Sequence, residues 1–266
     1  MNVAMPNHRT QLYDLAQPMF TGMPSSANHP GFRMALLRRH GDHVRSDGTS
    51  ASNELIITGG HVGTHMDALA HMSHHGRLHG GVDAAEAQAG GRFSSLGIDD
   101  VPLMCGRGVL LDVAGAKDVR VLPAGYEITE DDLVDAARKF DVSFDGADFI
   151  LVRSGWTAHF DNPDAFRGQE SGVPGPNEAA GKWLASRHIR ATGADTIAYE
   201  HIPAKLGHAV LPVHRTLLVE HGIHIVEVMN LDPLAEAGVY EFGLLLAPLK
   251  IVGATGSPLR PVAWAL

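Results

Sequence analysis

The sequence predicts a single α/β domain. Candidate strands and helices alternate along the chain, and no linker, repeat or low-complexity segment divides them. The length of 266 residues allows one large domain, and hydrophobic residues make up 44% of the chain, which is enough to fill a core. We therefore expect one domain spanning residues 1–266, with residues 1–10 as a loose, polar tail.

The first part of the chain is expected to contain two short strands separated by a loop. The strands are predicted at residues 12–15 and 54–58. Residues 18–31 are rich in Pro, Gly, Ser and Asn, which is typical of a loop. Within it, Phe20, Met23 and His29 could belong to a lid over a substrate, although a plain surface loop explains the composition equally well.

The middle of the chain alternates helix and strand signals. Residues 82–88 are expected to form a short helix or turn. Residues 107–113 form an apolar run bounded by glycines, which is typical of a buried strand. Thr129 is a good N-cap, and the three acidic residues after it suit the positive end of a helix. A further strand is predicted at residues 148–153.

The last third is expected to complete the sheet. Asn177 can cap a helix that continues to residue 187, and Gly222 is placed to end a helix over residues 212–221. The strands predicted in this part are residues 196–199, 224–228, 241–246 and 260–266.

Composition argues against several classes of partner. The net charge of −9, without a basic cluster, argues against nucleic acid. No segment reaches the ~18 apolar residues of a membrane span, and residues 1–18 contain no apolar run of signal-peptide length. A single cysteine excludes an internal disulfide framework and fits a reducing compartment. We expect a cytoplasmic protein that binds neither nucleic acid nor membrane.

Residues 59–81 contain six of the 17 histidines and the strongest functional signal. Neutral imidazole and carboxylate are common ligands of Zn²⁺, Mn²⁺ and Fe²⁺, so four such groups within eleven residues predict a metal site. The pattern is His61-x-Gly63-x-His65-x-Asp67-x-x-x-His71. The later histidines of this segment, His74, His75 and His79, are expected in a polar loop.

Three glycines, Gly59, Gly60 and Gly63, argue against a long helix through this pattern. A strand followed by a glycine-rich turn explains the sequence better, because glycine allows a sharp bend and a close approach to a ligand. A zincin helix is excluded by Val62, which stands where the catalytic Glu of that motif would be.

The segment His61-Val62-Gly63-Thr64-His65-Met66-Asp67, followed by His71, resembles the signature of the cyclase family of metal-dependent hydrolases. That family includes bacterial kynurenine formamidase and isatin hydrolase. The resemblance extends from about residue 14 to the C-terminus, and it departs at Leu69, where those two enzymes usually carry proline. It implies a swivelling β/β/α-type fold with a central mixed sheet, and a homo-oligomer, either a dimer or a tetramer.

The resemblance also implies that the site is completed far along the chain, by His214 and Glu227. The sequence gives Glu227 some support of its own, because a carboxylate inside an apolar strand is costly unless it is paired or binds a metal; a buried salt bridge is the alternative. Other histidines compete with His214 and rank below it: His201, His208, His221 and His224.

One or two divalent ions, Mn²⁺ or Zn²⁺, are expected per chain. In the family pattern, His61, His65 and Asp67 hold the first ion, and Asp67 and Glu227 bridge to a second one with His214. His71 would then be the catalytic residue that moves the proton.

These assignments predict a hydrolase that cleaves an amide, formamide or lactone-type bond of a small molecule with metal-activated water. Phe20, Trp156 and Phe160 suggest that the substrate could be aromatic. Two alternatives remain: a non-catalytic metal-binding scaffold with the same fold, and a non-haem iron dioxygenase, since His/carboxylate sets also hold Fe²⁺. The presence of His71 beside a complete ligand set favours the enzyme.

Overall fold

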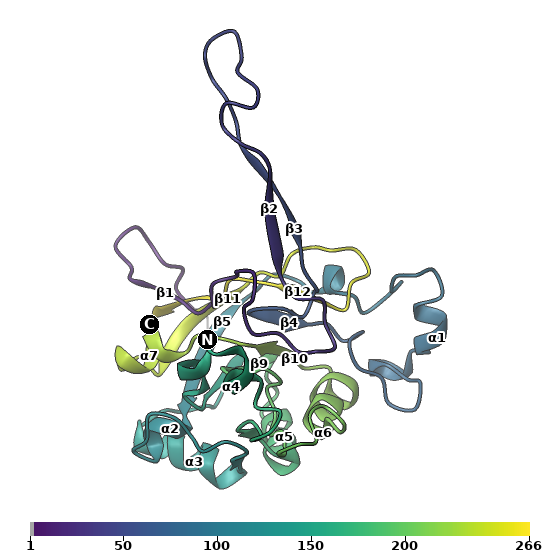
Figure 1. Cartoon of the computed structure of the whole chain (residues 1–266). Coiled ribbons are helices and arrows are strands. Elements are labelled where there is room, and N and C mark those ends of the chain that lie inside the picture. The colour runs from purple at the N-terminus through teal and green to yellow at the C-terminus, as the bar shows by residue number, and fades with distance from the viewer. Residues whose placement is uncertain (1–2) are drawn as a thin grey trace.

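Nine strands form one mixed sheet, and a separate two-stranded arm extends from it (Figure 1). The computed structural model describes residues 3–266. Across the sheet, the strands follow the order β1 (Leu12–Asp14), β13 (Val262–Ala265), β11 (Glu241–Leu246), β5 (Met104–Asp112), β7 (Phe149–Arg153), β9 (Ala191–Ala194), β10 (His224–Glu227), β4 (His65–Asp67) and β12 (Gly256–Pro258).

The centre of the sheet is parallel and its two sides are antiparallel. Strands β5, β7, β9 and β10 run parallel to one another, whereas β4 and β12 on one side and β11, β13 and β1 on the other pair antiparallel. Strand β12 is an edge of the sheet, yet only residues 259–261 separate it from β13 near the opposite edge. Four residue steps span at most about 14 Å, so the sheet must curl until its ends lie close together.

The curl divides the core into a part inside the sheet and a part beneath the helices. Along β5, Val109 and Leu111 pack with the helical core, while Leu110 packs with Phe242 and Met66 on the other face. All of these side chains are fully buried. Burial on both faces explains why this strand is an apolar run without alternation, as the sequence predicted.

The helices gather mainly on the side of the sheet opposite the arm (Figure 1). Both predicted N-caps are confirmed. Thr129 and Asp132 form a capping box at the start of the helix Glu130–Lys139, and the Asn177 side chain accepts the Ala180 N–H at the start of the helix Glu178–Ala185. The α-helices are α1 (Ala84–Ala87), α2 (Val113–Ala116), α3 (Glu130–Lys139), α4 (Pro163–Arg167), α5 (Glu178–Ala185), α6 (Pro212–His214) and α7 (Asp232–Glu236). Short 3₁₀ turns are η1 (His79–Gly81), η2 (Ile98–Asp100) and η3 (Trp156–His159), and a π-helical stretch, η4 (Arg215–His221), continues α6 up to Gly222.

The arm is a hairpin formed by β2 (Arg33–Arg38) and β3 (Asn53–Ile57). It projects away from the remainder of the chain, as Figure 1 shows. Every residue of both strands is exposed. The sequence predicted β3 but not β2, and it did not indicate that the hairpin would stand apart from the core.

The strand predicted at residues 196–199 is wrong. The sheet uses β9 instead, a run of small residues in which a Cβ at Gly193 would lie 2.5 Å from the sulfur of Met229. Residues 195–200 bend away from the sheet, and the Thr196 carbonyl accepts the Val228 N–H at 3.0 Å. Small residues give β9 little strand propensity, so tight packing rather than propensity selects it.

The N-terminal tail, predicted to be loose, is attached to the domain at one point. The Ala4 carbonyl accepts the indole N–H of Trp264 at 3.0 Å. Residues 1 and 2 of this tail lie outside the described residues. Across residues 3–266, none of the helices combines the length and apolarity that a bilayer crossing needs.

Candidate metal centre

The pairing of β4 with β10 brings together three of the predicted ligands. In this antiparallel register His65 lies opposite Glu227, and Asp67 lies opposite Ile225. Alternate residues of a strand share a face, so His65, Asp67 and Glu227 point to the same side, whereas Met66 points into the core. Glu227 Oε2 lies 3.4 Å from His65 Nε2. The sheet register thus explains how two residues 162 positions apart in the sequence, His65 and Glu227, meet.

His61 reaches the same point from the turn before β4. Its Nδ1 atom lies 2.7 Å from Asp67 Oδ1, and its Nε2 atom lies 2.9 Å from Thr255 Oγ1. The ring lies against the backbone of β12, where a Cβ at Gly256 would be 2.5 Å from His61 Cε1. Glycine at position 256 is therefore required for this placement of His61.

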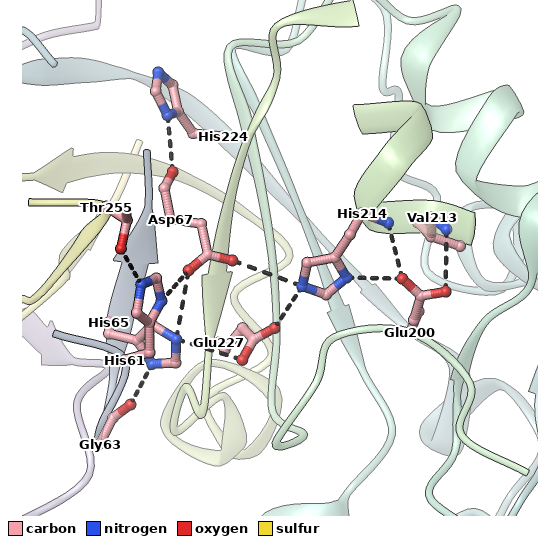
Figure 2. Close-up of polar contacts among 10 residues, drawn as sticks. All are labelled: His61, Gly63, His65, Asp67, Glu200, Val213, His214, His224, Glu227 and Thr255. Carbon is pink, nitrogen blue, oxygen red and sulfur yellow. Dashed lines mark hydrogen bonds and ion pairs between the residues drawn. The ribbon is translucent and has the colours of Figure 1, made fainter. Parts of the chain in front are cut away.

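His214 enters from the opposite side, on helix α6. Its Nε2 atom lies 3.1 Å from Glu227 Oε1 and 3.7 Å from Asp67 Oδ2. Its Nδ1–H donates to Glu200 Oε1 at 2.7 Å. Figure 2 shows His214 between the two strand carboxylates and Glu200.

Together, these side chains surround Asp67. Its Oδ1 atom faces His61 and His65, and its Oδ2 atom faces His214. Asp67 is 1% exposed, and Oδ2 has no hydrogen-bond partner among residues 3–266. An unpartnered, fully buried carboxylate oxygen is costly unless a cation compensates it. The mixed nitrogen and oxygen donor set suits a divalent transition ion such as Zn²⁺ or Mn²⁺, so these residues fit the expected metal.

Each metal-facing histidine is oriented by a contact on its other ring nitrogen. The partners are Thr255 for His61, the Gly63 carbonyl for His65 (2.8 Å) and Glu200 for His214. Such contacts fix the ring orientation and leave one nitrogen for the ion. The sequence did not identify Glu200 or Thr255, because neither belongs to the histidine-rich segment; an acidic residue within a small, apolar run was the one available signal for Glu200.

Two residues beside the carboxylates have an unusual backbone. Val228, next to Glu227, has φ 56°, and Tyr199, next to Glu200, has φ 57°. A left-handed conformation is strained for branched or bulky residues, and such strain concentrates at functional sites. Both residues are buried, so the surrounding core holds them in place.

The cluster shifts the pKa values of its members. Burial alone would raise the pKa of Asp67, but the neighbouring histidines outweigh it and hold that pKa well below its usual range. Burial opposes protonation of His61 and His214, yet hydrogen bonds to Asp67 for His61, and to Glu200 and Glu227 for His214, raise both pKa values. Without an ion, these two histidines therefore retain protons above the usual range of imidazole.

His71 lies beside the cluster on the turn after β4. Its ring centroid is 4.0 Å from that of His61 and 6.2 Å from that of His214. Burial lowers its pKa to about 3, so the ring is neutral at pH 7. One nitrogen of His71 comes within 4.8 Å of ligand atoms of Asp67 and His214, a distance that suits either a ligand or a proton carrier.

A narrow pocket leads to these residues. Its volume is about 460 Å³. Residues 24–29, which precede the arm, form one wall of the pocket. From this wall the His29 ring stacks on the His61 ring, with the ring centroids 5.1 Å apart. His208 and Leu211 line the opposite part. Of the residues named for a lid, His29 lines this pocket, whereas Met23 is buried in the core.

The three aromatic residues expected at the substrate, Phe20, Trp156 and Phe160, do not line this pocket. Trp156 and Phe160 are buried in the core, and the indole N–H of Trp156 donates to the Phe166 carbonyl at 2.8 Å. Phe20 is 42% exposed and packs edge-to-face on Phe160. The pocket wall consists of smaller residues of the same core cluster, Ile197, Ala198 and Val228.

Among the competing histidines, His224 contacts the cluster through the backbone. Its Nδ1–H donates to the Asp67 carbonyl at 2.9 Å, which supports β4 from the side away from the ligands. The ranking of His214 above His224 agrees with this geometry.

Comparison with known proteins points to one family. The model of the Cyclase family matches residues 13–201. The chain is similar to isatin hydrolase from Roseibium aggregatum, with 27% identity over 229 residues that cover 82% of this chain and 76% of the relative.

Two solved structures support the same relationship. One, described as a novel cyclase, has 29% identity and a TM-score of 0.84, over 96% of this chain and 89% of that chain. Another, described as a predicted metal-dependent hydrolase from Bacillus stearothermophilus, has 25% identity and a TM-score of 0.62, over 97% of this chain and 99% of that chain. The curled mixed sheet is therefore the fold of these neighbours.

Proposed function

Since this chain belongs to the Cyclase family, we propose that it is a metal-dependent hydrolase that cleaves an amide, formamide or lactone-type bond of a small molecule. Its similarity to isatin hydrolase supports hydrolysis. The bond class is what the resemblance to the family implies, and a divalent-ion donor set beside a neutral imidazole suits its hydrolysis.

One observation carries this proposal: Asp67 is fully buried, its Oδ2 atom has no hydrogen-bond partner within residues 3–266, and imidazole nitrogens face both of its oxygens. We assign His61, His65, Asp67, His214 and Glu227 as the residues that hold one or two ions, either Mn²⁺ or Zn²⁺. A bound divalent ion supplies a Lewis acid that lowers the pKa of water and polarises a carbonyl oxygen.

His71 has the protonation state that proton transfer requires. Because burial keeps the ring neutral at pH 7, it can accept a proton from the attacking water. The resulting imidazolium is a strong acid, and it returns the proton to the leaving amine or alkoxide. The negative charge of Asp67 favours the protonated ring during this step.

The pocket suits a small substrate. Its free space is narrow, and His29 and His208 flank the entrance to the cluster. Burial lowers the pKa of both histidines, so the neutral rings can donate or accept a hydrogen bond without adding charge. We propose that these two side chains contact the substrate, in place of Phe20, Trp156 and Phe160.

A hydrolysis screen tests the proposal. Protein loaded with Mn²⁺ or Zn²⁺ is assayed with N-formylkynurenine, isatin and small lactones, next to His71→Ala and to His75→Ala, whose histidine is exposed in a loop. We expect turnover of at least one bond class, lost in His71→Ala and unchanged in His75→Ala. Metal-loaded protein without any turnover would identify a scaffold, and oxygen uptake with Fe²⁺ without hydrolysis would identify a dioxygenase.

A further inference from the structure

A second hollow adjoins the pocket that leads to the metal centre. Its volume is about 540 Å³. Ser26, Ile197 and His208 line both spaces, so they form a wall that the two share. Beyond this wall, Arg167 and Gln169 line the second hollow, which we call the outer chamber. The outer chamber therefore extends the space that begins at the metal centre.

The two spaces differ in the charge of their linings. Among residues 3–266, the lining of the metal-centre pocket includes the carboxylate of Glu227 but no lysine or arginine. The outer chamber, within the same described residues, is lined by Arg167 and by no aspartate or glutamate. An arginine without an acidic neighbour in the same lining suits an anion, and its planar fork of N–H donors matches a carboxylate.

Most hydrogen-bond donors of the outer chamber have no partner inside the protein. Arg167 donates through one terminal nitrogen to Asp164, whose side chain is 90% exposed, and an exposed pair of this kind contributes little. The side-chain amides of Asn28 and Gln169 also line the chamber, and within the described part of the chain neither forms a hydrogen bond. These groups can therefore bind a ligand without breaking a structural contact of the core.

Arg167 and Gln169 are held on a firm base. The preceding residue, Phe166, is fully buried, and its carbonyl accepts the indole N–H of Trp156 at 2.8 Å. Gly168, between the two, has φ 56°, and a Cβ at this position would overlap the Gly172 carbonyl oxygen. Only glycine allows the sharp turn that ends α4 here, so the turn places the side chains on both sides of it at the chamber.

We propose that the outer chamber binds a carboxylate group of the substrate, at the end remote from the bond that is cleaved. The inference rests on the proposed hydrolysis and adds a substrate class to it, namely acyl compounds with a distal carboxylate. Arg167 pairs with this carboxylate in place of the exposed Asp164, while Asn28 and Gln169 donate further hydrogen bonds. Ile197 and His208, at the shared wall, contact the middle of the substrate.

Calorimetric binding of dicarboxylates tests the chamber without any turnover. Metal-loaded full-length protein is titrated with glutarate, adipate, pimelate and suberate, and with the monocarboxylate of equal chain length in each case. One carboxylate imitates the acid released by hydrolysis at the metal centre, and the other reaches Arg167. We expect at least one dicarboxylate to bind about 10–100-fold more tightly than its monocarboxylate, the usual contribution of hydrogen bonds to a charged group.

Arg167→Met should abolish this advantage of the dicarboxylate. Arg138→Met is the matched control, because Arg138 forms the same type of exposed pair, with Asp135 three residues before it, but lies on α3 and lines neither space. The control should retain the advantage, and circular dichroism checks that both variants are folded. The absence of a dicarboxylate advantage in the wild type, or its survival in Arg167→Met, would overturn the proposal.

Kinetics with matched substrates separates this inference from the proposed function. The pairs are formanilide with 4-formamidobenzoate, and dihydrocoumarin with its 6-carboxylate. Arg167→Met should raise KM about 10–100-fold for the compound with a carboxylate, with kcat little changed, and should leave both constants of the neutral compound unchanged. Equal effects on both members of a pair would show a structural role and refute the subsite. Absent turnover with a retained dicarboxylate advantage would support the chamber and refute hydrolysis of these bonds.

Discussion

The carboxylate of Glu200 accepts the Nδ1–H of His214 at 2.7 Å and also accepts the backbone N–H groups of Val213 and His214. One buried side chain thus caps the start of α6 and sets the orientation of a histidine ring on that helix. As a result, Nε2 of His214 faces Asp67 and Glu227. The metal centre therefore depends on a residue that binds no ion itself.

Replacing Glu200 by glutamine should weaken metal binding about 10–100-fold. The amide keeps the shape but removes the charge that holds the Nδ1 proton on His214. Competition with a chelator measures the affinity. Glu130→Gln is the control, since Glu130 is exposed in the first turn of α3. Unchanged affinity in Glu200→Gln would show that the carboxylate is only a helix cap.

Asp67→Asn should lose most of the bound metal while the protein remains folded. Asparagine preserves the volume but removes the charge that faces three histidines. Elemental analysis of protein purified without a histidine tag, together with circular dichroism, measures both properties. Asp14→Asn, in a partly exposed pair with Arg260, should retain wild-type metal content. Full metal content in Asp67→Asn would contradict the assigned centre.

His71→Ala should lower kcat by about 10²–10⁴-fold, the usual contribution of general acid–base catalysis, and should leave metal content near normal. The reason is that His61, His65 and Asp67 already form a cluster without it. Steady-state kinetics and elemental analysis separate the two effects. Loss of metal in this variant would make His71 a ligand, and unchanged turnover would make it a bystander.

Gly256→Ala should displace His61 and reduce metal affinity, although residue 256 carries no donor group. Residue 256 begins strand β12, and a Cβ on it would lie 2.5 Å from the His61 ring. Gly90→Ala is the control, because no atom lies within 4 Å of a Cβ at Gly90. Chelator competition for both variants measures the difference; equal affinities would mean that His61 can shift without loss.

Metal binding should release protons at pH 7 and strengthen as the pH rises. The pKa values of His61 and His214 are raised in the metal-free site, so both rings hold protons above pH 6.5 that a metal must displace. Titration calorimetry in buffers of different ionisation enthalpy measures the number released. The release should decrease at pH 9 and in His214→Ala. Binding that is independent of pH between 6.5 and 9 would contradict these shifts.

The sequence predicted the local parts of this site well. His61, His65, Asp67 and His71 lie within one segment, and the glycines around them indicated a turn rather than a helix. Strands buried on both faces, such as β5, also carry a strong local signal. These features depend on residues that are neighbours in the chain.

What the sequence could not predict depends on packing between distant segments. Trp156 and Phe160 are aromatic residues of the kind that often contact substrates. Only the folded structure shows that they are buried in the core, while smaller residues of the same cluster line the pocket. Strand β9 consists of small residues and has little propensity. The contacts from Thr255 to His61 and from Glu200 to His214 join separate elements, so spacing gave no indication of them.

The pairing of His65 with Glu227 has a consequence for how the gene can change. Insertions or deletions in the surface loops leave this pairing intact, whereas a shift of β10 by one residue would turn Glu227 away and present Val226 to the histidine cluster. No intermediate alignment exists, because side chains alternate strictly along a strand. Length variation among descendants of this chain should therefore be tolerated at the arm tip and absent within β4 and β10.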